Sequence, residues 1–303
     1  MAINICMDLS TLTRKNNLAL QHRQEQERKL TDPELLAVSK TFPYRGFVDI
    51  CIDNCPTFVM FTNNDDFVVR SYFWNGKNAY ENTSVRLWTR LVENAGVVVD
   101  AGSYTGLYSL IATAKNPKAK VYAFEALDRV SCRFQVNKAA NGAATINIIN
   151  AAVSDTIGET QFNVFRGDNI LGTGSSLHDR SNSKQVVVDV KKIKVTTIDT
   201  ELSAETNRVD LIKIDAEGAE SEVITGAINV IKRDMPDILV ELLSDADVAT
   251  VERLLEGLPY NFYSIDDATG HVTQLQHLQP ASNRHNSNTL LSTKPLSTLE
   301  GML

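Results

Sequence analysis

The segment VVVDAGSYTG at residues 97–106 constrains the fold of this chain more than any other part of the sequence. A β-branched run ends in an acid, Asp100. A turn of small residues with two glycines follows, and then the apolar-periodic stretch 107–112. This order predicts a strand, a tight loop and a helix. Glycine lets a backbone approach a ligand closely, and a helix N-terminus offers unpaired N–H groups. The segment predicts either a cofactor site at the carboxyl edge of a parallel sheet or an ordinary strand-to-helix turn.

The spacing of Gly102 and Gly106 bears on which cofactor such a loop would take. A dinucleotide loop would read Gly-x-Gly-x-x-Gly. Here Ser103 and Tyr104 stand where the middle glycine would be, and Asp100 precedes the loop. This pattern suits a cofactor with a cationic amino-acid end. S-adenosyl-L-methionine (SAM) has such an end, whose ammonium and sulfonium groups would lie near Asp100.

A second acid follows the next predicted strand. The run VYAFE at residues 121–125 is short and apolar and ends in Glu125. An acid at this position accepts hydrogen bonds from ribose hydroxyls in sheets of this kind. By itself Glu125 could equally be a solvated carboxylate. Together with the glycine loop, it favours cofactor binding.

The cluster KIDAEGAE at residues 213–220 follows another buried strand, so its charges are expected at the same sheet edge. A carboxylate there could deprotonate or orient a substrate hydroxyl during methyl transfer. Asp215 is the first candidate and Glu217 the second. The alternative is that Asp215 caps the next helix and Glu217 stabilises its first turn. Glu81 and Glu241 are weaker candidates, for which a solvated carboxylate is the better interpretation.

Composition restricts the class of protein. The chain has 303 residues, of which 43% are hydrophobic, and this length can bury a large core. Its net charge of -7 argues against nucleic acid as the main partner. No run of residues is long enough to span a membrane and no signal peptide is recognisable, so we expect a cytoplasmic protein. The histidines and cysteines lack ligand spacing, so no metal site is expected.

Patterning divides the chain into three predicted parts. Residues 1–40 form a helical extension that could be solvated, cover the core or form a homo-oligomer contact, with a helix that Asp32 caps and that begins at Pro33. Residues 41–78 form a small antiparallel β-subdomain, which includes a strand at 67–70. Residues 79–303 form an α/β domain with a mostly parallel sheet and helices on both faces, one of them near 219–232. A β insertion at about 159–197 contains three strand-like runs. Its Gly/Ser-rich stretch 169–177, followed by His178, could be a substrate loop or a plain flexible connector.

Together these motifs resemble the FkbM-type family of SAM-dependent methyltransferases. The resemblance covers roughly residues 80 to 293 and is most specific at residues 213–220. It implies a class I methyltransferase (Rossmann-like) fold with a seven-stranded sheet. The family usually has Gly-Ala-Asn-x-Gly where this loop reads Gly-Ser-Tyr-Thr-Gly, and usually has a proline shortly after Glu125.

The resemblance also implies roles for individual residues. Asp215 and Glu217 would face the acceptor and carry the catalysis. The residues implied to bind SAM are Asp100, Gly102, Ser103, Thr105, Gly106, Glu125, Asn150 and Ala152.

The implied activity is SAM-dependent O-methylation of a sugar, glycan or natural-product hydroxyl. Two other classes of function stay open. One is a nicotinamide-dependent oxidoreductase on a similar sheet. The other is a non-catalytic SAM-binding or scaffold protein.

Overall fold

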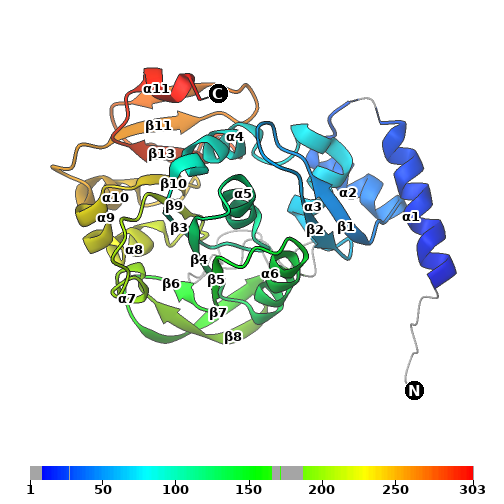
Figure 1. The fold of residues 1–303 in the computed structure, drawn as a ribbon, viewed down its shortest axis with the longest axis horizontal. Helices are drawn as coiled ribbons and strands as arrows, with labels where there is room; N and C mark the ends of the chain where they lie inside the picture. The colour runs from blue at the N-terminus through cyan, green and yellow to red at the C-terminus, as the bar shows by residue number, and fades with distance from the viewer. Residues whose placement is uncertain (1–8, 27, 166–170, 172–186, 303) are drawn as a thin grey trace.

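A computed structural model describes residues 9–26, 28–165, 171 and 187–302 (Figure 1). Its centre is an eight-stranded sheet in the order β12-β11-β13-β10-β9-β3-β4-β5. The strands are β3 (Val97–Ala101), β4 (Lys120–Phe124), β5 (Ile146–Ile149), β9 (Leu211–Ile214), β10 (Asp237–Glu241), β11 (Asn261–Ile265), β12 (Val272–Leu275) and β13 (Asn288–Ser292). The five strands from β5 to β10 in this order pair in parallel, and β13 pairs antiparallel with both β10 and β11.

Helices cover both faces of this sheet, which explains why its central strands β3 and β9 are buried throughout. Side chains from β3, β9 and β10 alternate between two separate cores: Val98 and Leu211 lie in one, and Val99 and Ile212 in the other. The first core is covered by α4 (Asn82–Leu91), α5 (Leu107–Lys115) and α6 (Asp128–Ala140). The second is covered by α7 (Ile198–Glu201), α8 (Glu220–Thr225), α9 (Ile228–Asp234) and α10 (Val248–Leu254). The α/β architecture predicted for this part of the chain is thus confirmed.

Two details of this sheet differ from the prediction. The sheet has eight strands rather than seven, and β13 was not predicted. Asn288, Thr289 and Ser292 of β13 are all buried, so the strand lacks the alternation of polar and apolar residues that marks a half-exposed strand. The single helix expected near 219–232 is two helices, because the chain breaks at Gly226. A Cβ at Gly226 would lie 2.0 Å from the Ser154 carbonyl oxygen, so glycine is required for this close approach.

The N-terminal part lies to one side of the large sheet (Figure 1). It contains α1 (Leu9–Gln24), α2 (Asp32–Thr41), the antiparallel pair β1 (Gly46–Ile50) and β2 (Phe58–Thr62), α3 (Phe67–Asn75) and a short 3-10 helix (Gly76–Asn78). A second 3-10 helix (Val92–Asn94) follows α4, and α11 (Leu296–Glu300) lies near the C-terminus.

Two predictions in this part were wrong. The strand predicted at 67–70 is the start of α3. Asp66 caps that helix by accepting the Val69 N–H at 3.0 Å, and this local bond outweighs the β propensity of the run. Helix α2 is capped by Thr31 rather than by Asp32. The Thr31 N–H donates to the Glu34 carboxylate at 2.8 Å, which is one arm of a capping box.

A second, three-stranded sheet has the order β6-β8-β7 and corresponds to the predicted β insertion. Its strands are β6 (Ala152–Val153), β7 (Gly158–Phe165) and β8 (Val187–Thr196). Within residues 159–197 three strand-like runs were expected. The Gly/Ser-rich stretch from 169, proposed as a substrate loop, and His178 fall outside the described residues except at Leu171, which is buried.

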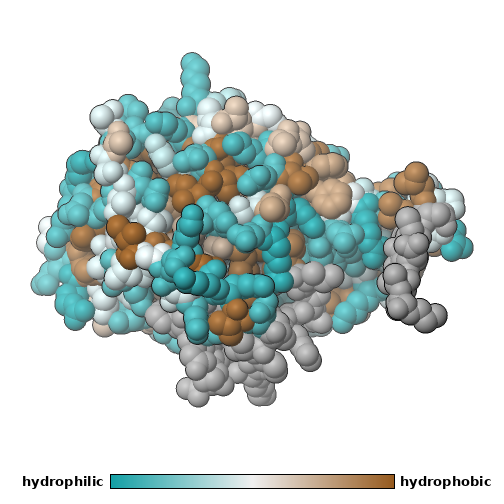
Figure 2. Space-filling model, turned by 90° about the horizontal axis from the view of Figure 1, so that it is seen from below, coloured by the Kyte–Doolittle hydropathy of each residue, from teal (hydrophilic) through white to brown (hydrophobic). Residues whose placement is uncertain are grey.

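The molecular face in Figure 2 carries hydrophobic residues in separate groups among hydrophilic ones. Within the part of the chain that the structure describes, no helix combines the length and apolar character needed to cross a bilayer.

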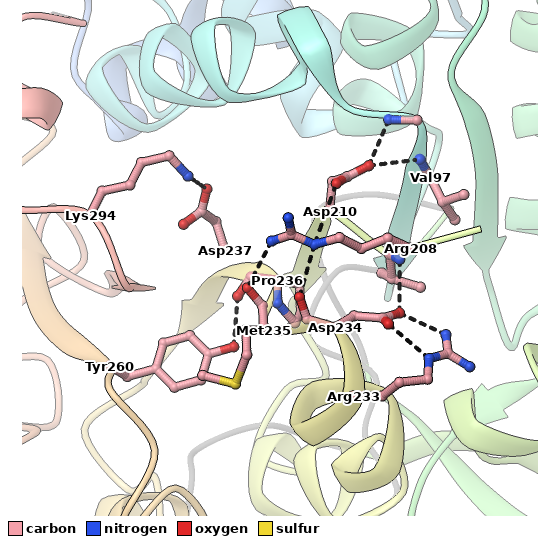
Figure 3. Close-up of polar contacts among 12 residues, drawn as sticks. Val97, Arg208, Asp210, Arg233, Asp234, Met235, Pro236, Asp237, Tyr260 and Lys294 are labelled. Atoms are coloured by element: carbon pink, nitrogen blue, oxygen red, sulfur yellow. Dashed lines mark hydrogen bonds and ion pairs between the residues drawn. The ribbon is translucent and has the colours of Figure 1, made fainter. Parts of the chain in front are cut away.

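Polar contacts hold the amino ends of β3, β9 and β10 together (Figure 3). Asp210 accepts the N–H groups of Gly96 at 2.7 Å and of Val97 at 3.3 Å. Asp234 accepts the Val209 N–H at 2.8 Å. The Tyr260 hydroxyl donates to the Pro236 carbonyl at 2.7 Å, and Lys294 pairs with Asp237. These contacts leave the opposite, carboxyl edge of the sheet available for a site.

Replacing Asp234 by alanine should destabilise the protein by about 1–3 kcal/mol, because the buried Val209 N–H would lose its acceptor. Urea denaturation of the purified variant measures this change. Glu256→Ala, at an exposed helix-end position, is the matched control and should change stability by less than about 0.5 kcal/mol. Equal destabilisation by both variants would contradict this assignment.

Candidate active site

A cavity of about 550 Å³ lies at the carboxyl ends of β3, β4, β9 and β10. Acidic side chains line it at the end of each of these strands: Asp100, Glu125, Asp215 and Glu241. The order in which the chain adds strands reverses here, because β4 lies on one side of β3 and β9 on the other. Ligands of doubly wound sheets bind at this kind of switch point. The structure therefore brings the strand-end acids named from the sequence into one cavity.

The glycine loop after β3 is held by backbone contacts with both neighbouring strands. The N–H groups of Gly102 and Ser103 donate to the Phe124 carbonyl at 3.1 and 2.8 Å, and the Asp215 N–H donates to the Ala101 carbonyl at 2.9 Å. Gly102 has φ +81°, and a Cβ there would lie 1.8 Å from the Asp215 carbonyl oxygen. Only a glycine fits this position, and the loop and the β9 end are consequently fixed against each other.

Asp100 is almost fully buried at the end of β3. Its carboxylate accepts a hydrogen bond from the Ser109 hydroxyl at 2.5 Å, which joins it to the first turns of α5. Burial raises the pKa of Asp100 to about 6, although the Ser109 hydrogen bond and the Lys213 charge act in the opposite direction. The carboxylate is therefore ionised at neutral pH at the cost of desolvation, and a nearby cation would stabilise it.

Glu125 follows β4 and is 9% exposed. Its carboxylate accepts the Leu127 N–H at 2.8 Å. Burial raises the pKa of Glu125 to about 7, and the neighbouring backbone N–H groups only partly offset this effect. In its ionised form this carboxylate can accept hydrogen bonds from hydroxyl donors.

Not all of the predicted cofactor residues line the cavity. Ser103 and Ala152 do, whereas Thr105, Gly106 and Asn150 do not. The Thr105 carbonyl accepts from Asn137 at 2.9 Å, and a Cβ at Gly106 would lie 2.1 Å from the Phe134 ring.

Asn150 donates its side-chain amide to the Glu125 carbonyl at 2.9 Å. Thr105, Gly106 and Asn150 thus shape the loops of the site rather than its lining surface.

Asp215 and Glu217 both line the cavity, as predicted. The alternative interpretation required Asp215 to cap the next helix and Glu217 to lie in its first turn. Neither holds, because α8 begins at Glu220 with Ala219 before it. Glu217 has φ +51°, a left-handed conformation that is costly for a residue with a side chain. The turn between β9 and α8 therefore presents both carboxylates to the cavity.

Lys213 is a site residue that was not singled out from the sequence. It is 1% exposed, and its ammonium lies 3.2 Å from Asn288 Oδ1 and 4.0 Å from the Asp215 carboxylate. Burial alone lowers the pKa of a lysine, but the charges of Asp215, Glu81 and the other nearby carboxylates outweigh that effect and raise it. The sequence could have indicated this role, because Lys213 lies within the apolar strand run LIKI and a lysine is seldom fully buried without partners.

Glu81 and Glu241 also line the cavity, contrary to the solvated interpretation. Glu81 precedes α4 and accepts a hydrogen bond from the Tyr108 hydroxyl. Glu241 accepts one from the Ser287 hydroxyl at 2.9 Å. Burial and the charge of Asp215 raise the pKa of Glu241 well above its usual range. Burial likewise raises the pKa of Glu81, and the Lys213 charge only partly opposes this.

The N-terminal segment forms part of the cavity wall. Lys29, Leu30 and Asp32 line the cavity. Asn75 holds Leu30 through both backbone groups, at 2.8 and 3.1 Å. Asp32 forms an ion pair with Arg284 from the other end of the chain. Segments far apart in the sequence therefore meet at this end of the cavity.

The fold and the strand-end acids define a nucleotide-cofactor enzyme built on a doubly wound sheet. Residues 100–264 match the family model described as the methyltransferase FkbM domain, which is more than half of the chain. The chain belongs to the FkbM methyltransferase family, and SAM is its cofactor. The order β5-β4-β3-β9-β10-β13-β11, with β12 added at the edge, is the class I methyltransferase sheet that the resemblance implied.

Two curated proteins are similar to this chain. The methyltransferase sdnD of Sordaria araneosa is 27% identical over 184 residues, covering 52% of this chain and 71% of that protein. The AMB antimetabolite synthetase AmbE of Pseudomonas aeruginosa is 24% identical over 189 residues, covering 52% of this chain and 9% of that protein.

Two solved structures are also similar. The methyltransferase FkbM from Methylobacillus flagellatus has a TM-score of 0.43 and 13% identity, covering 93% of this chain and 60% of that one. The SAM-dependent methyltransferase from Agrobacterium tumefaciens has a TM-score of 0.43 and 12% identity, covering 82% of this chain and 71% of that one.

Replacing Gly102 by alanine should destabilise the protein and abolish binding of S-adenosylhomocysteine, because the new Cβ would collide with the Asp215 carbonyl. Gly142→Ala is the matched control. Gly142 has φ +60°, and a Cβ there would meet nothing within 4 Å, so the change should cost only about 1–2 kcal/mol from its backbone conformation. Denaturation midpoints and ligand-induced thermal shifts measure both variants. A Gly102→Ala protein as stable as Gly142→Ala would disprove the contact.

Glu125→Gln should stabilise the ligand-free protein more at about pH 8 than at about pH 5. The pKa of Glu125 is raised in the folded state, so ionisation disfavours folding. Stability is therefore lost as pH rises from the usual pKa of 4.5 towards about 7. Glutamine does not titrate and avoids this loss. Urea denaturation of both proteins at the two pH values measures the difference, and a pH-independent difference would show that the carboxyl titrates normally.

Proposed function

We propose that this chain is an O-methyltransferase that uses SAM to methylate a hydroxyl of a sugar, a glycan or a natural product. The observation that supports this proposal is the position of Asp215 and Glu217. They line the same cavity as Asp100 and Glu125, one strand beyond the glycine loop. A cofactor held over β3 and β4 would therefore present its reactive end to carboxylates that can receive or orient a hydroxyl.

The residues of the loop fit the cofactor. Gly102 lines the cavity beside Asp100, and Asp100 offers a buried negative charge near the position of a cationic amino-acid end. Glu125 would accept hydrogen bonds from the ribose hydroxyls, and Ala152 would pack near the adenine. Ser103 lines the same wall. When bound, SAM supplies an activated methyl group on its sulfonium.

The acceptor residues have distinct proposed roles. Asp215 is the first candidate to take the hydroxyl proton or to orient the hydroxyl, and Glu217 is the second. The Lys213 ammonium lies 4.0 Å from the Asp215 carboxylate, so a positive charge stands beside the group proposed to receive the proton. Holding the acceptor oxygen in line with the methyl group supplies much of the rate, and a general base adds typically about 10²–10⁴-fold.

Membership of a methyltransferase family argues against the oxidoreductase alternative. The non-catalytic alternative predicts SAM or S-adenosylhomocysteine binding without any transferred methyl group, so the two readouts together separate it from the proposed enzyme.

The test is to incubate the protein with SAM carrying a ¹³C-labelled methyl group and a panel of hydroxylated sugars, glycans and natural products. We expect product whose methyl carbon has the chemical shift of an O–CH₃ group. Asp215→Asn should lower turnover by about 10²–10⁴-fold, since the amide cannot accept the proton. Its thermal shift with S-adenosylhomocysteine should match that of the wild type.

A labelled methyl group on nitrogen, carbon or sulfur would overturn O-methylation. Unchanged turnover in Asp215→Asn would remove Asp215 as the base. No thermal shift with S-adenosylhomocysteine would contradict the placement of the cofactor itself.

A further inference from the structure

The part of the cavity beyond Asp100 carries far more negative than positive charge. We call it the acceptor half and define it by five carboxylates and one ammonium: Glu81, Asp215, Glu217, Glu241, Asp267 and Lys213. They come from separate elements, since Glu81 precedes α4, Glu241 ends β10 and Asp267 follows β11. The electrostatic effects of Asp215 and Lys213 on both Glu81 and Glu241 show that the charges share one environment.

Lys213 does not balance these acids. Its ammonium already contacts Asn288 at 3.2 Å, and it lies 5.2 Å from the centre of the Tyr108 ring. The basic side chains of Lys29, Arg284 and His285 belong to exposed residues, and Arg284 is paired with Asp32. Burial, followed by the charges of neighbouring carboxylates, keeps the pKa values of Glu81 and Glu241 raised. The acceptor half therefore has a deficit of positive charge.

The cofactor is not positioned to remove this deficit. Neighbouring strands lie about 4.8 Å apart, and Glu241 ends the strand three places from that of Glu125. The two carboxyl groups are thus separated by roughly 14 Å across the strand ends. The cationic end of SAM is expected beside Asp100, between them. Glu241 lies on the far side, where only an acceptor would reach.

Aromatic rings accompany the acids. Phe67 and Tyr80 line the cavity, with their rings in edge contact at 6.0 Å, and Tyr108 lines it as well. Tyr108 already accepts the Lys213 ammonium over its ring at 5.2 Å, so this wall stabilises organic cations. Among the described residues, no three histidine, cysteine, aspartate or glutamate side chains converge as a metal-binding group. The arrangement of carboxylates and aromatic rings matches an ammonium group rather than a metal ion.

We propose that the acceptor is a small molecule that carries an ammonium group beside its methylated hydroxyl, and that Glu241, with the Phe67 and Tyr80 rings, recognises the ammonium. This inference rests on the proposed function and specifies its substrate class. Neutral and anionic acceptors should bind less tightly. A neutral polyol adds no positive charge to the acceptor half, and a sugar acid or phosphate is repelled by its carboxylates.

The test measures binding to protein saturated with S-adenosylhomocysteine, so no turnover is required. The probes are matched pairs of amino alcohols and amino sugars with their N-acetylated forms, titrated by calorimetry near neutral pH. We expect an amine to bind about tenfold or more tightly than its N-acetylated partner. Glu241→Gln should remove most of that preference and leave binding of the N-acetylated partner unchanged, whereas Glu256→Gln, at an exposed position, should alter neither.

The proposal is overturned if no amine in the panel binds more tightly than its acetylated partner, including the case in which no probe binds. It is also overturned if the preference survives in Glu241→Gln. The chemical shift of the transferred methyl group judges O-methylation separately. Amine-selective binding with an N-methyl product would support the recognition site and refute the O-methylation proposal.

Discussion

The site depends on one backbone contact, the approach of Gly102 to the carbonyl of Asp215. That contact, with the Asp215 N–H bound to the Ala101 carbonyl, fixes the loop after β3 against the end of β9. The Phe124 carbonyl accepts two N–H groups of the same loop and adds β4. Three strand ends are therefore positioned by main-chain hydrogen bonds, which need no particular side chain. The main chain therefore sets the positions of the acids at these strand ends.

Charge burial is the cost of this arrangement. Asp100 and Glu125 are desolvated carboxylates, and both have raised pKa values as a consequence. Lys213 offsets part of the repulsion in the neighbouring half of the cavity. The amino edge of the sheet is organised in the opposite way, because carboxylates such as Asp234 there have full hydrogen-bond partners. The contacts at the amino edge of the sheet therefore stabilise the fold, whereas the buried carboxylates at the carboxyl edge destabilise it. This is expected where function competes with stability.

The sequence predicted what local patterns encode. β3, β4 and β9 were predictable because each is a short apolar run followed by an acid, and the parallel topology placed those acids together. Contacts between distant segments escaped prediction. The helix break at Gly226 depends on the close approach of Ser154, which is far away in sequence. Strand β13 lies between β11 and β10 and is buried, so its sequence lacks the alternation of polar and apolar residues that would predict a strand. The wall formed by Leu30 depends on Asn75, and no local periodicity signals such a pair.

The two walls of the cavity lie in different parts of the chain. Asp100, Glu125 and Asp215 fall within residues 100–264, the part that matches the family. Tyr80, Glu81 and the Asp32–Arg284 ion pair lie outside it. Changes in the flanking segments can therefore alter the shape and charge seen by an acceptor while the loop around Gly102 stays as it is. Such a division gives a lineage of enzymes a route to new substrates that leaves the family-matched wall of the cavity intact.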